Sequence, residues 1–157
     1  IQLLKATTGT RVIAVDSDER KLDVARSLGA DIVLHSRNDT ANAIKNATNK
    51  VGADVILDMV GADATLALGA KALRAEGRLV IVGLAGGKLD VDFFSIPYGA
   101  QVATSYWGTL PELMELVALA RAKKVKLEVE AYPLSQAIAV YDKLRRGQVK
   151  GRAVIVP

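Results

Sequence analysis

The sequence has no cysteine, a single histidine and no long apolar run. Without cysteine the chain can form neither a disulfide nor a thiolate zinc site, and one histidine cannot supply a multi-histidine metal site. No stretch approaches the roughly 20 apolar residues of a transmembrane helix. Residues Ile1–Ala6 are too short and wrongly flanked for a signal peptide. We therefore expect a cytoplasmic protein that does not contact membranes and has no metal site within these residues.

Aromatic residues are also scarce, at 4%, and the net charge is only +4. The densest basic cluster, Lys123, Lys124 and Lys126, has no interleaved aromatic residues, so nucleic-acid binding has no support. Half of the chain is apolar, and small aliphatic residues dominate, as is typical of helices packed on both faces of a parallel sheet. A chain of 157 residues is long enough for one domain with a core.

Short β-branched runs alternate with amphipathic stretches over the first half of the chain. The runs RVIAVD, DIVL, ADVILD and RLVIVG have the length and composition of buried strands. Leu66, Ala70 and Leu73 stripe one of the intervening helices, which we expect Gly77 to end. This alternation predicts an α/β fold with a Rossmann-like, doubly wound parallel sheet. Further on, Thr109-x-x-Glu112 is a capping box for a helix whose apolar stripe should face inward.

Asp16, at the end of RVIAVD, is the first residue that indicates a ligand. In dinucleotide-binding folds an acid at the end of the second strand bonds the adenosine ribose, about 20 residues after a G-x-G-x-x-G motif. That motif is absent here, and counting back places it just before Ile1. We therefore expect the chain to begin inside the first crossover helix, after the first strand and the phosphate loop. The carboxylate would repel a 2′-phosphate and so favour NAD over NADP. A capping aspartate, or the acid of an S-adenosylmethionine-dependent methyltransferase, is the alternative.

Two Val-Gly pairs follow the next two predicted strands. Val60-Gly61 and Val82-Gly83 would lie at the carboxyl ends of parallel strands, where open α/β sheets bind ligands. Either glycine could instead merely turn the chain. Trp107 fits a ligand-pocket wall or a core or interface aromatic equally well, and Arg152 fits a pyrophosphate ligand or a solvated surface arginine.

Longer segments carry a family resemblance. The segments FFSIPYGAQVATSYWGTLPELMELVALARAKKV and LRRGQVKGRAVIVP resemble bacterial NAD-dependent secondary-alcohol dehydrogenases of the zinc-type medium-chain alcohol dehydrogenase family. The opening IQLLKA is similar to the stretch that follows that family's GxGGxG loop. The match extends over all 157 residues. It implies that residues 1–157 are an NAD-binding domain fragment, with residues 151–157 returning toward a catalytic domain outside this sequence.

The resemblance also implies roles for individual positions. Asp16 would bind the adenosine ribose together with Lys21 or Arg20, and Val60-Gly61 would lie on the adenosine side. The backbones of Val82, Ser105 and Trp107 would meet the nicotinamide carboxamide, and Arg152 would bind the pyrophosphate. The full candidate set for cofactor binding is Asp16, Arg20, Lys21, Val60, Gly61, Val82, Gly83, Leu84, Ser105, Trp107 and Arg152.

The family's reaction is hydride transfer from an alcohol to NAD, assisted by a catalytic zinc. Its cysteine and histidine ligands and its proton relay match no residue here, so no catalytic or metal-binding residue is assigned and the fragment should be inactive by itself. The expected partners are NAD, a small alcohol or ketone, and further copies of the chain joined through residues 88–106 in a homodimer or homotetramer. The alternatives are a zinc-free quinone or enoyl reductase, which usually favours NADPH, and a non-catalytic nucleotide-binding or oligomerisation module.

Overall fold

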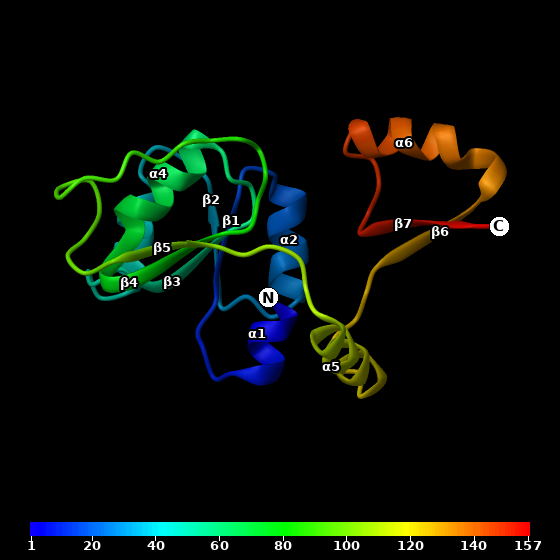
Figure 1. Cartoon of the computed structure of the whole chain (residues 1–157), viewed down its shortest axis with the longest axis horizontal. Helices are drawn as coiled ribbons and strands as arrows, with labels where there is room; N and C mark the ends of the chain where they lie inside the picture. The colour runs from blue at the N-terminus through cyan, green and yellow to red at the C-terminus, as the bar shows by residue number, and fades with distance from the viewer. The chain divides into compact units, whose positions relative to one another are not determined.

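The computed structural model describes all 157 residues and divides them into two compact units. The first unit comprises Ile1 and Gly9–Gly108, and the second comprises Gln2–Thr8 and Thr109–Pro157. The first unit contains β1 (Ile13–Asp16), α2 (Glu19–Ser27), β2 (Ile32–His35), α3 (Thr40–Ala47), β3 (Ala53–Asp58), α4 (Asp63–Ala72), β4 (Leu73–Ile81) and β5 (Gln101–Thr104) (Figure 1). The second contains α1 (Gln2–Thr7), α5 (Leu110–Arg121), β6 (Val129–Pro133), a 3₁₀ helix (Leu134–Gln136), α6 (Ala137–Arg145) and β7 (Arg152–Val156).

In the first unit, β1 and β2 form a parallel pair in which Asp16 stands opposite His35. The helix between them begins after Asp18, whose carboxylate accepts the N–H of Arg20 at 2.9 Å and so caps α2. Leu22, on the inner face of this helix, is only 1% exposed. The cap and this buried leucine together orient α2 against the strand pair.

The second sheet of this unit has the order β3-β4-β5, with every neighbouring pair parallel. Helix α4 covers one face of it (Figure 1), and Leu66 of α4 and Leu79 of β4 are fully buried between the two layers. The prediction that α4 would extend to Gly77 is wrong. The helix ends at Ala72 because Leu73 adopts extended backbone and pairs with Ala53, at the beginning of β3.

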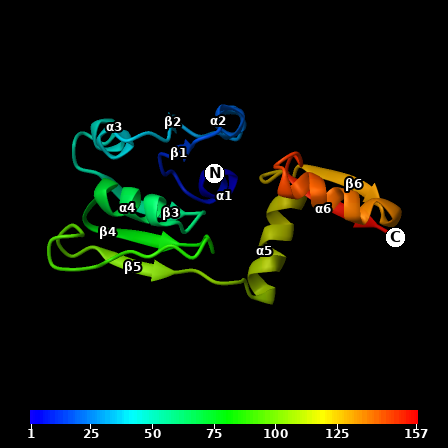
Figure 2. The same cartoon turned by 90° about the horizontal axis from the view of Figure 1, so that it is seen from above.

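Strands β1 and β3 lie in the same unit but in separate sheets (Figure 2). Each has a single strand neighbour, so one edge of each strand has no ladder partner. Val55 and Leu57 of β3 are 56% and 45% exposed, which is unusual for a strand of a doubly wound sheet. In a doubly wound sheet, a further strand lies between the strands that correspond to β1 and β3. In this structure β1 and β3 are not hydrogen-bonded to each other.

In the second unit, β6 and β7 form a parallel pair and α6 packs against β6. Helix α1 joins this unit through Gln2, whose side-chain amide makes two hydrogen bonds with the backbone of Lys126, at 2.9 and 2.7 Å. The predicted capping box of α5 is confirmed by mutual hydrogen bonds between Thr109 and Glu112. The predicted inward stripe of α5 is not, because no residue of that helix is buried. None of the helices in the chain is both long and apolar enough to span a membrane.

Candidate functional site

Asp16 is the last residue of β1, and its carboxylate is accessible. One oxygen accepts the N–H of Asp18 at 2.9 Å, which tightens the turn between β1 and α2. The other lies 3.9 Å from the ammonium of Lys21, and the Asp16 side chain remains 33% exposed. A carboxylate held at a strand end, with spare lone pairs and a cation beside it, can accept hydrogen bonds from two neighbouring hydroxyl groups.

Arg20 does not share this arrangement. Its guanidinium binds the Asp18 carboxylate through two nitrogens, at 3.1 and 2.8 Å. This pairing holds the pKa of Asp18 below its ordinary value of 3.8 and raises the pKa of Arg20. Lys21, rather than Arg20, is therefore the cation that accompanies Asp16 in the structure.

The two predicted Val-Gly pairs follow the carboxyl ends of the neighbouring strands β3 and β4, and the two turns that they form touch each other. Gly61 has a left-handed φ of 71°, and a methyl group added there would overlap the carbonyl of Gly83. A methyl group added at Gly83 would overlap the backbone of Val60. The glycines thus permit a close backbone approach between two turns, a reason for glycine that is independent of any ligand.

Asp58, which the sequence reasoning did not select, connects these two turns. Its buried side chain is 6% exposed and accepts hydrogen bonds from the N–H groups of Val60 and Gly61, at 2.9 and 3.0 Å. Its main-chain carbonyl accepts the N–H groups of Val82 and Gly83, at 2.8 and 3.0 Å. The available signal was that ADVILD, like RVIAVD, is an apolar strand that ends in an acid.

The remaining candidates of this unit follow β4 and β5. The N–H of Ser105 donates to the carbonyl of Ile81 at 2.9 Å, which extends the pairing of the two strands by one residue. Trp107 has a left-handed φ of 51°, is 84% exposed and packs edge-on against Tyr106, with ring centroids 5.2 Å apart. Leu84 is 83% exposed. The large apolar side chains of Trp107 and Leu84 therefore offer exposed surface to a partner or a ligand.

Arg152 belongs to the second unit, where it begins β7. Its N–H donates to the carbonyl of Glu128 at 2.9 Å, and its side chain is exposed. The guanidinium can offer paired donors to an anion from this position. The other candidate residues belong to the first unit.

No cluster of three or more histidine, cysteine, aspartate or glutamate side chains in the chain could hold a metal ion. The single histidine, His35, is exposed at the end of β2, with Nδ1 3.2 Å from the carbonyl oxygen of Ser36. The donor set of these residues therefore does not fit a zinc ion.

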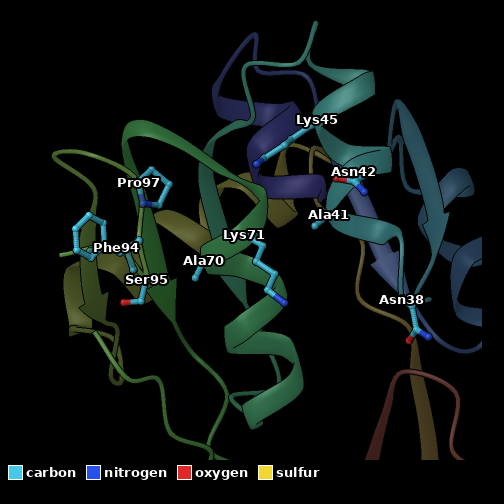
Figure 3. Close-up of a pocket in the computed structure, with 10 residues that line it drawn as sticks. Asn38, Ala41, Asn42, Lys45, Ala70, Lys71, Phe94, Ser95 and Pro97 are labelled. Carbon is cyan, nitrogen blue, oxygen red and sulfur yellow. The ribbon is translucent and has the colours of Figure 1, made fainter. Parts of the chain in front are cut away.

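A hollow of about 500 Å³ lies between α3, α4 and the loop before β5. Figure 3 shows Lys45 of α3 and Lys71 of α4 at this hollow, with Pro97 and Phe94 on the loop side. None of the candidate cofactor-binding residues lines it. The hollow and the turns at the strand ends are therefore separate features.

Comparison with known proteins decides the family. The model of the zinc-binding dehydrogenase family matches residues 1–122. The chain belongs to this family. The chain is 34% identical over 157 residues to an alcohol dehydrogenase of Geobacillus stearothermophilus, which covers 99% of this chain and 46% of that protein. It is 30% identical to the D-arabinose 1-dehydrogenase (NADP(+)) of Saccharolobus solfataricus, over 100% of this chain and 45% of the relative.

Solved structures of family members confirm the α/β fold. The alcohol dehydrogenase of Aeropyrum pernix superposes with a TM-score of 0.88 at 39% identity, over 99% of this chain and 45% of that chain. The structure of an NAD-dependent alcohol dehydrogenase gives a TM-score of 0.87 at 27% identity, over 99% of this chain and 46% of that one. This family member thus spans slightly less than half the length of the relatives that it matches.

Proposed function

We propose that residues 1–157 form the coenzyme-binding part of an NAD-dependent alcohol dehydrogenase. The observation that carries the proposal is Asp16, an accessible carboxylate at the carboxyl end of a parallel strand, with Lys21 at 3.9 Å. Such a group binds the two adenosine ribose hydroxyls of a dinucleotide. Three relatives over 30% identical are named NAD-dependent alcohol dehydrogenases, which agrees with this choice of coenzyme.

The chain's own residues would bind and orient the coenzyme. Asp16 and Lys21 hold the ribose, the turn at Val60 lines the adenosine side, and the backbone after β4 meets the nicotinamide. NAD, when bound, accepts a hydride from the alcohol carbon. The residues described contain no zinc site, so polarisation of the alcohol is not assigned to any of them.

Grafting this segment into an intact relative tests the proposal. We expect the chimera to prefer NAD over NADP, because a 2′-phosphate would lie against the Asp16 carboxylate. Asp16→Gly should relax this preference, since it removes both the acceptor and the repulsion. A chimera that prefers NADP would contradict the proposal and favour the second candidate, an NADPH-dependent reductase of the same fold. That candidate has one specific observation behind it, namely that a relative 30% identical is named as NADP-dependent.

We also propose that copies of the chain associate through residues 88–106. Phe93, Phe94 and Tyr98, in the segment before β5, are 87%, 91% and 82% exposed. Strand β5 is the last strand of its sheet and pairs only with β4, so its outer edge has no strand partner. Exposed aromatic groups beside an unpaired edge are typical of an interface.

A further inference from the structure

We propose that Asp58 is a positioning residue of this nucleotide site, whose carboxylate fixes the turn after β3 and whose carbonyl fixes the turn after β4. The inference rests on the proposed function, because it concerns the shape of the surface offered to the coenzyme. Asp58 is not among the candidate cofactor-binding residues.

The side chain of Asp58 fills an anion site made by its own chain. The N–H groups of Val60 and Gly61 converge on Oδ1, at 2.9 and 3.0 Å, and consecutive N–H groups arranged in this way form an anion-binding nest. The hydroxyl of Thr65, in the first turn of α4, donates to Oδ2 at 2.8 Å. The carboxylate is thus bonded through both oxygens although it is only 6% exposed.

The carbonyl groups of the same turn are also bonded within the chain. The oxygen of Val60 accepts the N–H of Ala85 at 3.0 Å, and the oxygen of Gly61 accepts the N–H of Gly87 at 2.8 Å. The peptide groups of the turn therefore have their hydrogen-bond partners inside the protein. The groups that the turn presents outward are the apolar side chains of Met59 and Val60, which are 68% and 51% exposed.

This arrangement has a consequence for the ligand. Because the Asp58 carboxylate occupies the nest, the turn offers a phosphate neither free N–H groups nor a favourable charge. It offers an apolar contact instead, which suits the face of a base or a sugar. Asp58 therefore directs the phosphates of the coenzyme away from the end of β3 and holds Val60 against the nucleoside.

A set of variants in the full chain tests the inference. Asp58→Ala leaves two buried N–H groups without their acceptor, whereas Asp58→Asn keeps an oxygen in the place of Oδ1. Thr48→Val is the matched control. The hydroxyl of Thr48 accepts the N–H of Gly52 at 3.0 Å before the amino end of β3, so its loss disturbs a comparable hydrogen bond at the opposite end of the strand.

The readout is the shift of amide NMR resonances as NAD is added. In the wild type we expect shifts at Asp16, Gly61 and Gly83. In Asp58→Ala the dissociation constant measured from the Asp16 resonance should rise about tenfold, and the shifts at the two glycines should disappear. Thr48→Val should behave like the wild type, and Asp58→Asn, which loses only the acceptor at Oδ2, should raise the dissociation constant by no more than about threefold. If Asp58→Ala does not fold, Thr65→Val removes the bond to Oδ2, together with the bonds between the Thr65 hydroxyl and Ala62, but keeps both bonds to Oδ1. It should raise the dissociation constant about threefold.

The outcomes separate the two proposals. Absence of a shift at Asp16 in the wild type would contradict the proposed function. A wild-type response at Asp16, with an Asp58→Ala variant that binds NAD equally well, would overturn the positioning role alone. The positioning role would also be overturned if either Thr48→Val or Asp58→Asn weakened binding as much as Asp58→Ala.

Discussion

At the contact between α4 and β4, we expect Gly69→Ala to lower the free energy of unfolding when Leu79 is present and to raise it when position 79 is alanine. Leu79 of β4 is completely buried, and a Cβ added at Gly69 of α4 would lie 2.9 Å from its Cδ1 and 3.5 Å from its Cδ2. The Leu79 side chain therefore occupies the space that an alanine at position 69 would need. The two residues should be strongly coupled in the free energy of unfolding.

The magnitudes follow from the packing. Leu79→Ala removes three buried carbons, worth about 2.4 kcal/mol at ~0.8 kcal/mol each, and the residual cavity brings the expected loss to about 3–4 kcal/mol. Gly69→Ala alone gains about 1 kcal/mol of helix propensity but crowds Leu79, which costs about 1–3 kcal/mol, so the expected net effect is a destabilisation of up to about 2 kcal/mol. In the Leu79→Ala background the crowding is absent, and the same change should stabilise by about 1–2 kcal/mol.

Urea unfolding followed by far-UV circular dichroism measures the four free energies of this cycle. The expected coupling between positions 69 and 79 is about 2–3 kcal/mol in favour of the double variant, and it should appear as a shift of the midpoint at constant slope. Effects of Gly69→Ala that were equal in both backgrounds would refute the packing of α4 on β4 at this point.

Three further predictions concern other parts of the chain. Thr40→Val should cost about 1–3 kcal/mol of unfolding free energy, because the buried Thr40 hydroxyl accepts the N–H of Arg37 at 2.7 Å; an unchanged urea midpoint would contradict this. The backbone and side-chain hydrogen bonds from Thr109 hold the pKa of Glu112 below its ordinary value of 4.5, so the capping contribution should be complete above that pH and disappear as the pH falls through the lowered pKa. Amide shifts of Thr109 should report this titration, and Glu112→Gln should abolish it. Phe94→Ser should weaken self-association in ultracentrifugation; a wild-type chain that is monomeric at micromolar concentration would count against the interface.

The features that the sequence predicted correctly are those that depend on neighbouring residues. RVIAVD and ADVILD are strands because their β-branched residues suit a buried parallel sheet. The cap of α5 follows from an acceptor side chain three residues before the N–H that it binds. These local requirements are satisfied wherever the segment lies in the fold.

The features that the sequence did not predict depend on contacts between distant segments. Helix α4 ends at Ala72 because Leu73 pairs with Ala53, a partner twenty positions earlier in the chain. The stripe of α5 correctly identifies its apolar side, but periodicity cannot say whether another element covers that side. Asp58 was missed because its importance comes from two turns that meet only when β3 and β4 pair. The cofactor roles of the candidate residues stay predictions.

The central claim is that Asp16 binds the adenosine ribose of NAD. A crystal structure of the protein with NAD tests it most directly. We predict that both hydroxyls of the adenosine ribose lie within about 2.6–3.2 Å of the Asp16 carboxylate oxygens, with the dinucleotide crossing the carboxyl ends of β3 and β4. A dinucleotide bound elsewhere, or an adenosine ribose held by other residues while Asp16 faces solvent, would contradict the account.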